Sequence, residues 1–258
     1  MSESPLLEAT EVGKRFGGIT ALSGVSLTVS PGEAVGLVGP NGAGKTTLFN
    51  CLLGILRPEN GRITFDGHDL IDLPVHRRAR LGIGRTFQRM ELFAEMTVRE
   101  HLLVAERARR GDGRLWKDLL GRGSPRAEEE HEVDEVLDLI GLRPVARRAI
   151  ESLTLGHGRL VELGRALMTR PSILLLDEPS SGLDQDESLA LAGVLDEVQA
   201  ERGTAILLVE HDLAMVERIA SRLYVLDFGK LIASGPQAEV LADPAVRKAY
   251  LGEAVASA

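Results

Sequence analysis

The sequence predicts an α/β fold: a mostly parallel sheet with helices on both faces, an antiparallel β subdomain and an inserted helical subdomain. Two short apolar runs favour buried parallel strands. Residues 34–38 precede a glycine-rich turn, and residues 173–176 precede Asp177-Glu178. A hairpin is indicated where Asn60-Gly61 and Asp66-Gly67 bracket a short strand-forming run. Strands that alternate with helices predict the parallel sheet, and the hairpin predicts the antiparallel lobe beside it.

The elements follow in chain order. Gly17-Gly18 separates the first two strands, and Pro31-Gly32 forms a turn before the third. An apolar stripe predicts a helix from Lys45 to Leu56 that stops before Pro58. The expected strands and hairpins of this half are residues 6–16, 19–29, 34–38, 62–65 and 81–87.

A helical lobe is expected at about residues 92–165. Residues 98–110 have helical character, and a glycine- and arginine-rich connection follows. Ser124-Pro125 can cap the next helix, which Gly141 ends. After it we expect a strand at 172–177, a helix at 185–201, a strand at 205–209, a helix at 212–220 and a hairpin at 223–235.

The composition limits the number of domains, the kinds of partner and the compartment that are expected. A chain of 258 residues with 44% hydrophobic content suits one large domain, or one domain with an inserted lobe. The net charge of -8 gives no indication of a duplex-binding surface, so the basic run at 77–80 is expected to be a solvated face. Cys51 is the single cysteine, which excludes an internal disulfide and suits a reducing cytosol; we expect it in the core. We find neither a signal peptide nor a membrane-spanning run, so a membrane role is expected to come through a partner.

A phosphate-binding loop is predicted at residues 39–46, which fit G-x-x-x-x-G-K-[ST]. Glycines let backbone N–H groups approach phosphate oxygens, and the following helix directs its positive end at the same anion. Lys45 would reach the β- and γ-phosphates, the Thr46 hydroxyl would bind Mg²⁺, and Thr47 adds a second hydroxyl. The predicted binding residues are Gly39, Asn41, Gly42, Gly44, Lys45, Thr46 and Thr47.

Two carboxylates narrow the possibilities, because such a loop alone suits a kinase, a GTPase or an ATPase. The run at 173–176 delivers Asp177 to the carboxyl edge of the sheet, where ligands bind in open α/β folds. Asp177 has the place of the carboxylate that holds Mg²⁺ through water. Glu178 follows at once and could polarise the attacking water as a general base.

In the order of these motifs the chain resembles the nucleotide-binding subunits of ATP-binding-cassette (ABC) transporters over nearly its whole length. The resemblance implies a P-loop NTPase with a RecA-like core. It implies that Phe16 stacks on adenine, that Gln88 contacts Mg²⁺ and relays to the membrane subunit, and that His211 is the switch histidine on the γ-phosphate. Residues 180–184 match the loop that crosses to the partner chain. We therefore expect one ABC ATPase domain at 6–253, with core and β subdomain at 6–91 and 166–253 and the helical subdomain at 92–165.

The segment Leu-Thr-Leu-Gly-His at 153–157 matches the family's Leu-Ser-Gly-Gly-Gln signature. Thr154 keeps a hydroxyl for the γ-phosphate, and Gly156 keeps a close backbone approach. His157 replaces the usual glutamine. In the family this segment caps the ATP bound to the other subunit, so we expect the composite site that it completes to hydrolyse ATP more slowly.

A finer resemblance is to the ATP-binding subunits of bacterial branched-chain amino-acid importers. It comes from three stretches: 85–98, 209–212 and the tail at 242–252. It implies ATP and Mg²⁺, a second ATP-binding subunit, transmembrane permease subunits and a solute-binding protein, with no nucleic acid, at the inner face of the cell membrane. Two alternatives stay open: a lipopolysaccharide extraction cassette, whose tail is similar, and a soluble cassette ATPase of translation or DNA repair. A small kinase or GTPase is disfavoured by the signature-like segment.

Overall fold

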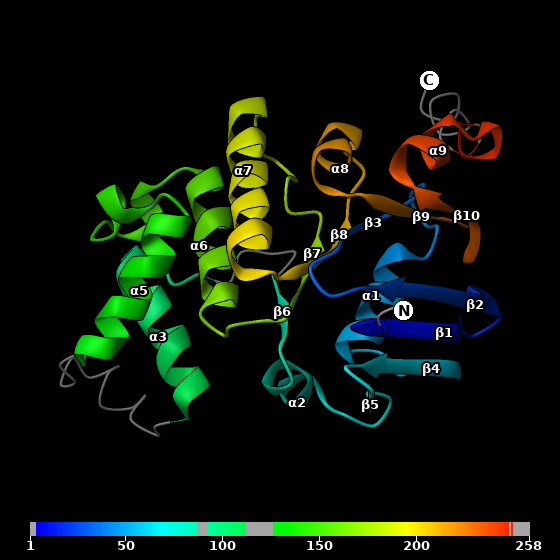
Figure 1. Ribbon diagram of the computed structural model, residues 1–258, viewed down its shortest axis with the longest axis horizontal. Helices are drawn as coiled ribbons and strands as arrows, with labels where there is room; N and C mark the ends of the chain where they lie inside the picture. The colour runs from blue at the N-terminus through cyan, green and yellow to red at the C-terminus, as the bar shows by residue number, and fades with distance from the viewer. Residues whose placement is uncertain (1–3, 87–91, 112–125, 248, 250–258) are drawn as a thin grey trace.

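The computed structural model describes residues 4–86, 92–111, 126–247 and 249. An antiparallel sheet lies at one side of the molecule, with strand order β2-β1-β4-β5 (Figure 1). Its strands are β1 (Leu7–Phe16), β2 (Ile19–Val29), β4 (Asn60–Phe65) and β5 (His68–Asp69). The expected antiparallel lobe is therefore present, and Asp66 and Gly67 make the β4–β5 turn with positive φ.

The second sheet is the core, with strand order β10-β9-β3-β8-β7-β6. All its neighbours are parallel except β9 and β10. The carboxyl ends of β3, β8 and β7 therefore meet at one edge, which is where ligands bind in such sheets. The strands are β3 (Ala34–Val38), β6 (Ile83–Arg85), β7 (Ile173–Asp177), β8 (Ala205–Val209), β9 (Arg222–Asp227) and β10 (Lys230–Pro236).

Helices cover the core sheet and extend beyond it. Figure 1 shows α3, α5 and α6 in green at the end of the molecule opposite the antiparallel sheet. The helices are α1 (Lys45–Leu53), α2 (Val75–Arg80), α3 (Val98–Arg110), α5 (Ala127–Leu139), α6 (Leu155–Leu167), α7 (Gln185–Arg202), α8 (Leu213–Ile219) and α9 (Gln237–Ala242), with 3₁₀ turns at Arg143–Val145 and Ile150–Ser152. The predicted α/β fold, with an antiparallel lobe and a helical lobe, is confirmed.

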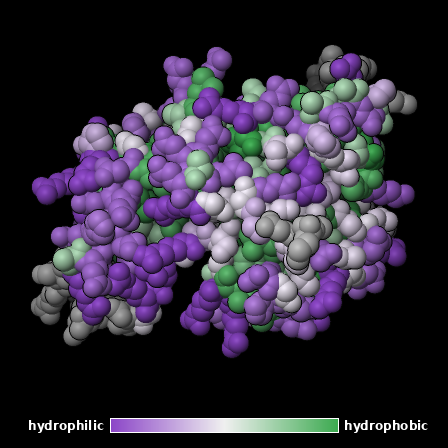
Figure 2. Space-filling model, viewed as in Figure 1, coloured by the Kyte–Doolittle hydropathy of each residue, from purple (hydrophilic) through white to green (hydrophobic). Residues whose placement is uncertain are grey.

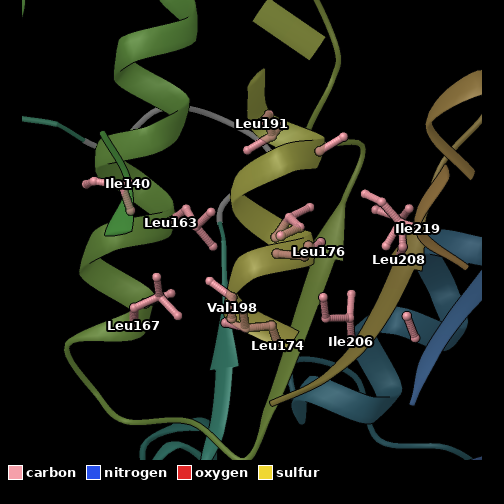
Figure 3. Close-up of a cluster of buried hydrophobic side chains, with 14 of the residues drawn as sticks. Ile140, Leu163, Leu167, Leu174, Leu176, Leu191, Val198, Ile206, Leu208 and Ile219 are labelled. Carbon is pink, nitrogen blue, oxygen red and sulfur yellow. The ribbon is translucent and has the colours of Figure 1, made fainter. Parts of the chain in front are cut away.

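The strands β7 and β8 are buried on both faces, which explains their unbroken apolar sequences. Alternate side chains of the two strands belong to different clusters. Leu174 and Leu208 join α6 and α7 in one cluster (Figure 3), while Leu175 and Leu207 join α1 in the other. Each such fully buried side chain contributes roughly 1.5–3 kcal/mol. The packing on both faces fixes where the carboxyl ends of β7 and β8 lie.

Two expectations about α1 and α2 are corrected. The predicted helix from Lys45 to Leu56 ends at Leu53, because Gly54 takes a left-handed conformation there. The run at 77–80 is not simply a solvated face, since Arg78 is only 2% exposed. Its guanidinium donates to the carbonyls of Cys51 (2.9 Å) and Leu52 (2.7 Å) at the end of α1. Arg78 thus satisfies carbonyls that the helix itself leaves without partners.

Cys51 lies in the core as expected, and burial raises the pKa of its thiol to about 11.

The helical lobe has a charged exterior and a buried ion pair. Hydrophilic residues cover most of the visible face over α3 and α5 (Figure 2). Inside, Arg107 of α3 and Glu129 of α5 lie 3.2 Å apart with almost no exposure. The predicted cap at Ser124-Pro125 lies outside the described residues.

Candidate nucleotide-binding site

The loop between β3 and α1 depends on glycine at two positions for space. A Cβ at Gly39 would lie 2.1 Å from the Leu226 carbonyl oxygen, and a Cβ at Gly44 would lie 2.7 Å from that of Ala21. At Gly42 there is space, but φ is +77°. These left-handed or otherwise unusual conformations are costly for residues with a side chain. The loop is thus held between β9 and β2 in one conformation.

The loop leaves helix α1 open to an anion. Gly44 is the N-cap residue of α1, and no side chain of the described residues caps it. The first amides of a helix need a partner and carry partial positive charge. Lys45 is buried, and its Nζ donates to the carbonyls of Gly39 (2.5 Å) and Pro40 (3.0 Å). The ammonium group therefore lies at the same place as the open amides.

A cavity of about 320 Å³ lies against this loop. It brings the loop together with Glu178, which follows strand β7. Its lining residues are Ile19, Thr20, Ala21, Asn41, Gly42, Ala43, Gly44, Lys45, Thr46, Thr47, Glu178, Phe228 and Gly229. Glycine amides, an ammonium and two hydroxyls suit a phosphate chain.

Asp177 at the end of β7 is placed to bind a cation. It is 6% exposed, and its Oδ1 has no hydrogen-bond partner in the described part of the chain. Burial and the adjacent Glu178 raise the pKa of Asp177 to about 6, although Lys45 acts in the opposite direction. A buried carboxylate oxygen without a partner among the described residues, close enough to Lys45 to interact with its charge, suits Mg²⁺. Mg²⁺ typically takes one or two carboxylates and completes its shell with phosphates and water. The described residues hold no cluster of three or more His, Cys, Asp or Glu arranged for a metal.

Glu178 and His211 meet across the carboxyl edge of β7 and β8. The backbone N–H of Glu178 donates to Val209 (2.8 Å), and its φ is +48°. Such conformations in non-glycine residues are costly and cluster at functional sites. His211 Nδ1 lies 4.0 Å from Glu178 Oε1. The general-base candidate and the predicted switch histidine are therefore neighbours.

Glu210 connects the two segments at this edge, a role that its sequence position alone did not predict. It is fully buried and accepts hydrogen bonds from Ser180 N (2.9 Å), Ser180 Oγ (2.5 Å) and His211 N (3.0 Å). It also accepts from Asp212 N (3.3 Å). A carboxylate that directly continues a buried strand needs several donors, and that position could have identified it. Glu210 ties the segment after β7 to the segment after β8.

Other predicted residues lie outside this cavity. Phe16 ends β1, is 46% exposed and lies with its ring 5.5 Å from Lys14 Nζ, but it does not line the cavity. Ile19 and Phe228 line it instead, and neither was predicted as a site residue. The indication for Phe228 was an aromatic residue where a two-residue hairpin turn favours Asn or Asp. Gln88 lies outside the described residues.

The signature-like segment begins helix α6, also outside the cavity. Thr154 is the N-cap residue, and its Oγ1 accepts from His157 N (3.3 Å). His157 Nδ1 lies 3.1 Å from the same hydroxyl. The N–H of Gly156 donates to Glu187 (3.2 Å), whose side chain a Cβ at this glycine would strike. Thr154 and Gly156 therefore do not line the cavity that contains the phosphate loop of their own chain.

Comparison with known proteins gives the family. Residues 22–181 match the family described as ABC transporter, and residues 230–256 match the one described as Branched-chain amino acid ATP-binding cassette transporter. The high-affinity branched-chain amino acid transport ATP-binding protein LivG of Escherichia coli is 42% identical, covering 97% of this chain and 99% of LivG. The lipopolysaccharide export system ATP-binding protein LptB of Haemophilus influenzae is 35% identical over 96% of this chain and 98% of LptB.

The architecture agrees with these sequence matches. An ATP-binding cassette of an ABC transporter, solved in its ADP conformation, superposes with a TM-score of 0.83 at 34% identity. The superposition covers 97% of this chain and 100% of that one. No helix among the described residues has the length and apolar character to cross a bilayer. The chain belongs to the ABC transporter family, as one of its ATP-binding cassettes.

Proposed function

We propose that the chain hydrolyses ATP to power a branched-chain amino-acid importer. The observation that carries the proposal is that one cavity brings a glycine-enforced phosphate loop together with Glu178, whose neighbour Asp177 has an Oδ1 without a partner in the described part of the chain. The names of LivG and of the family matched at the carboxyl terminus support the class of transported solute.

Different residues of the site would bind the phosphates, accept the proton and stabilise the developing charge. The amides of α1 and the Lys45 ammonium bind the β- and γ-phosphates of ATP. Glu178 accepts a proton from water as its oxygen attacks the γ-phosphorus, and the bond to the ADP oxygen breaks, which gives ADP and phosphate. His211 donates to the γ-phosphate, where negative charge develops. Mg²⁺, held by Thr46, by Asp177 through water and by Gln88, would neutralise that charge when bound.

A second chain is needed to complete the site. Thr154 and Gly156 lie at the start of α6, away from the cavity of their own chain. We propose that they close over ATP bound to a second ATP-binding subunit, and that the partner's signature closes this cavity. The other proposed partners are transmembrane permease subunits and a solute-binding protein, at the cytoplasmic face of the membrane. The proposed domain is residues 6–253, with the helical subdomain at 92–165.

One alternative has specific support. The 35% identity to LptB favours a lipid or lipopolysaccharide extraction transporter. The higher identity to LivG and the carboxyl-terminal match favour import. A soluble cassette ATPase is the least supported reading, since the named relatives belong to transport systems.

The test is isolation of the tagged chain from native membranes, with identification of its bound subunits and assay of the complex in proteoliposomes. We expect two permease subunits, and ATP hydrolysis that a leucine-loaded solute-binding protein stimulates. Glu178→Gln should lower hydrolysis roughly 10²- to 10⁴-fold and leave ATP binding intact. Co-purification with lipid-extraction subunits, or hydrolysis that Glu178→Gln leaves unchanged, would contradict the proposal.

A further inference from the structure

A carboxylate of the same chain occupies one of the first amide groups of helix α6. Gly156 is the second residue of α6, and its N–H donates to Oε1 of Glu187 (3.2 Å), which lies in the first turn of α7. A Cβ at Gly156 would lie 2.7 Å from the carboxyl carbon of Glu187. The carboxylate therefore lies directly against this glycine, and its oxygen takes the position that another anion would need at this amide.

The core holds the two helices, but the carboxylate between them can move. Helices α6 and α7 stand side by side in Figure 1, and Leu163 of α6 and Leu191 of α7 belong to one buried cluster (Figure 3). The Glu187 side chain is only half-buried. The contact with Gly156 can therefore open by rotation of one side chain, while the packing of the two helices stays intact.

The local structure of α7 accounts for only one of the two oxygens of Glu187. Its Oε2 accepts from Asp184 N (3.5 Å), and Asp184 Oδ1 accepts from Glu187 N (2.8 Å). These two bonds form the capping box at the start of α7. A capping box needs a single oxygen from the residue at the position of Glu187. The bond from Gly156 to Oε1 is thus an additional contact, which joins α6 to α7.

We propose that Glu187 is an autoinhibitory group, whose carboxylate holds the Gly156 amide until the γ-phosphate of ATP on a second cassette displaces it. This inference rests on the proposed function, in which Thr154 and Gly156 close over that ATP. Carboxylate and phosphate oxygens are both favoured at the amides of a helix N-terminus. Two anions that share one amide repel each other, so the carboxylate has to leave before the phosphate binds. Closure over ATP therefore includes the cost of breaking a charge-assisted hydrogen bond.

The experiment measures how ATP hydrolysis by the complex isolated from native membranes depends on the ATP concentration. In Glu187→Gln the capping box is kept, because glutamine also suits this position. Its neutral amide oxygen holds the Gly156 N–H less strongly than a carboxylate does. We expect the ATP concentration for half-maximal hydrolysis to fall about 3- to 10-fold. The maximal rate should stay within about twofold of the wild type, because the contact is already broken once ATP is bound.

Two controls separate this contact from a general effect of charge. Asp186 is exposed in the same first turn of α7, so Asp186→Asn removes an equal charge one residue away and leaves the contact in place. This variant should need the same ATP concentration as the wild type. The dissociation constant for ADP, measured by calorimetry on the full chain, should be equal in Glu187→Gln and the wild type, since Glu187 does not line the cavity of its own chain.

The possible outcomes distinguish the inference from the proposed function. If Glu187→Gln needs as much ATP as the wild type, or more, the contact is not inhibitory and the inference is overturned. An equal fall in Asp186→Asn overturns it as well, because the effect then belongs to charge alone. A wild-type complex that does not hydrolyse ATP overturns the proposed function and the inference together.

Discussion

At the scale of single residues, adjacent carboxyl groups have different environments. Asp177 is enclosed at the end of β7, while the side chain of Glu178 is partly exposed and lines the cavity. Burial holds the pKa of Asp177 above its usual value, at about 6. Its ionised form is therefore unfavourable in the absence of a cation, which suits the proposed binding of Mg²⁺.

This difference predicts a pH-dependent effect of Asp177→Asn on stability without metal or nucleotide. The pKa is raised in the folded state, from 3.8 to about 6, so ionisation penalises folding above pH 6. Asparagine removes the penalty, so the variant should be more stable by up to about 3 kcal/mol at pH 8. The difference should shrink as the pH falls below 6 and vanish below about pH 3, where the aspartate is protonated in both states. Urea unfolding in EDTA at several pH values measures this, and a pH-independent difference would contradict it.

Single residues also mark the limit of what the sequence predicts. The loop glycines and Lys45 follow from a motif whose chemistry is local. Arg78 was misplaced because its partners are carbonyls of α1, more than 20 residues away in the chain. Glu210 was missed for the same kind of reason, since Ser180 reaches it only after β7 and β8 pair.

At the scale of elements, the phosphate loop depends on the strands packed against it. The carbonyl of Leu226 in β9 leaves no space for a side chain at Gly39, whereas Gly42 faces open space. Elements with local determinants were predictable to the residue. Thr97 and Glu100 form a capping box at the start of α3, and Gly111 ends it in a left-handed conformation. The end of α1 could not be predicted to the residue, because a left-handed Gly54 and the distant Arg78 determine it together.

The two glycines predict unequal costs for the same substitution. Gly42→Ala should lower the free energy of unfolding by about 1–2 kcal/mol, the cost of a left-handed residue with a side chain. Gly39→Ala adds a clash with backbone and should cost at least about 2 kcal/mol more. Chemical denaturation without nucleotide measures both. Equal losses would show that β9 does not constrain the loop.

At the scale of the whole molecule, the cavity and the signature-like segment belong to different parts of the fold. The cavity lies where β3 meets α1, and the signature-like segment begins α6, which stands with α3 and α5 in Figure 1. The sequence predicted this separation only through family resemblance. Residues 153–157 carry no local indication of which chain's nucleotide they serve.

His157→Gln tests what this segment contributes to a partner. His157 Nδ1 lies beside the Thr154 hydroxyl, and we expect it to compete with phosphate for that hydroxyl. Glutamine should release the hydroxyl and raise ATP turnover of the assembled complex about 2- to 10-fold, as one hydrogen bond allows. The affinity of this chain's own cavity for ADP should not change. Unchanged turnover would contradict the expected role of His157.

The central claim is that the cavity is half of a site completed by a second polypeptide. Native mass spectrometry of Glu178→Gln, isolated from its own cells and held with either ATP or ADP and MgCl₂, tests it most directly. With ATP we predict an assembly in which this 27.8-kDa chain is joined to a second cassette, identical or different, with ATP retained. With ADP we predict that the two cassettes separate. A single 27.8-kDa chain carrying ATP, with no second cassette, would contradict the claim.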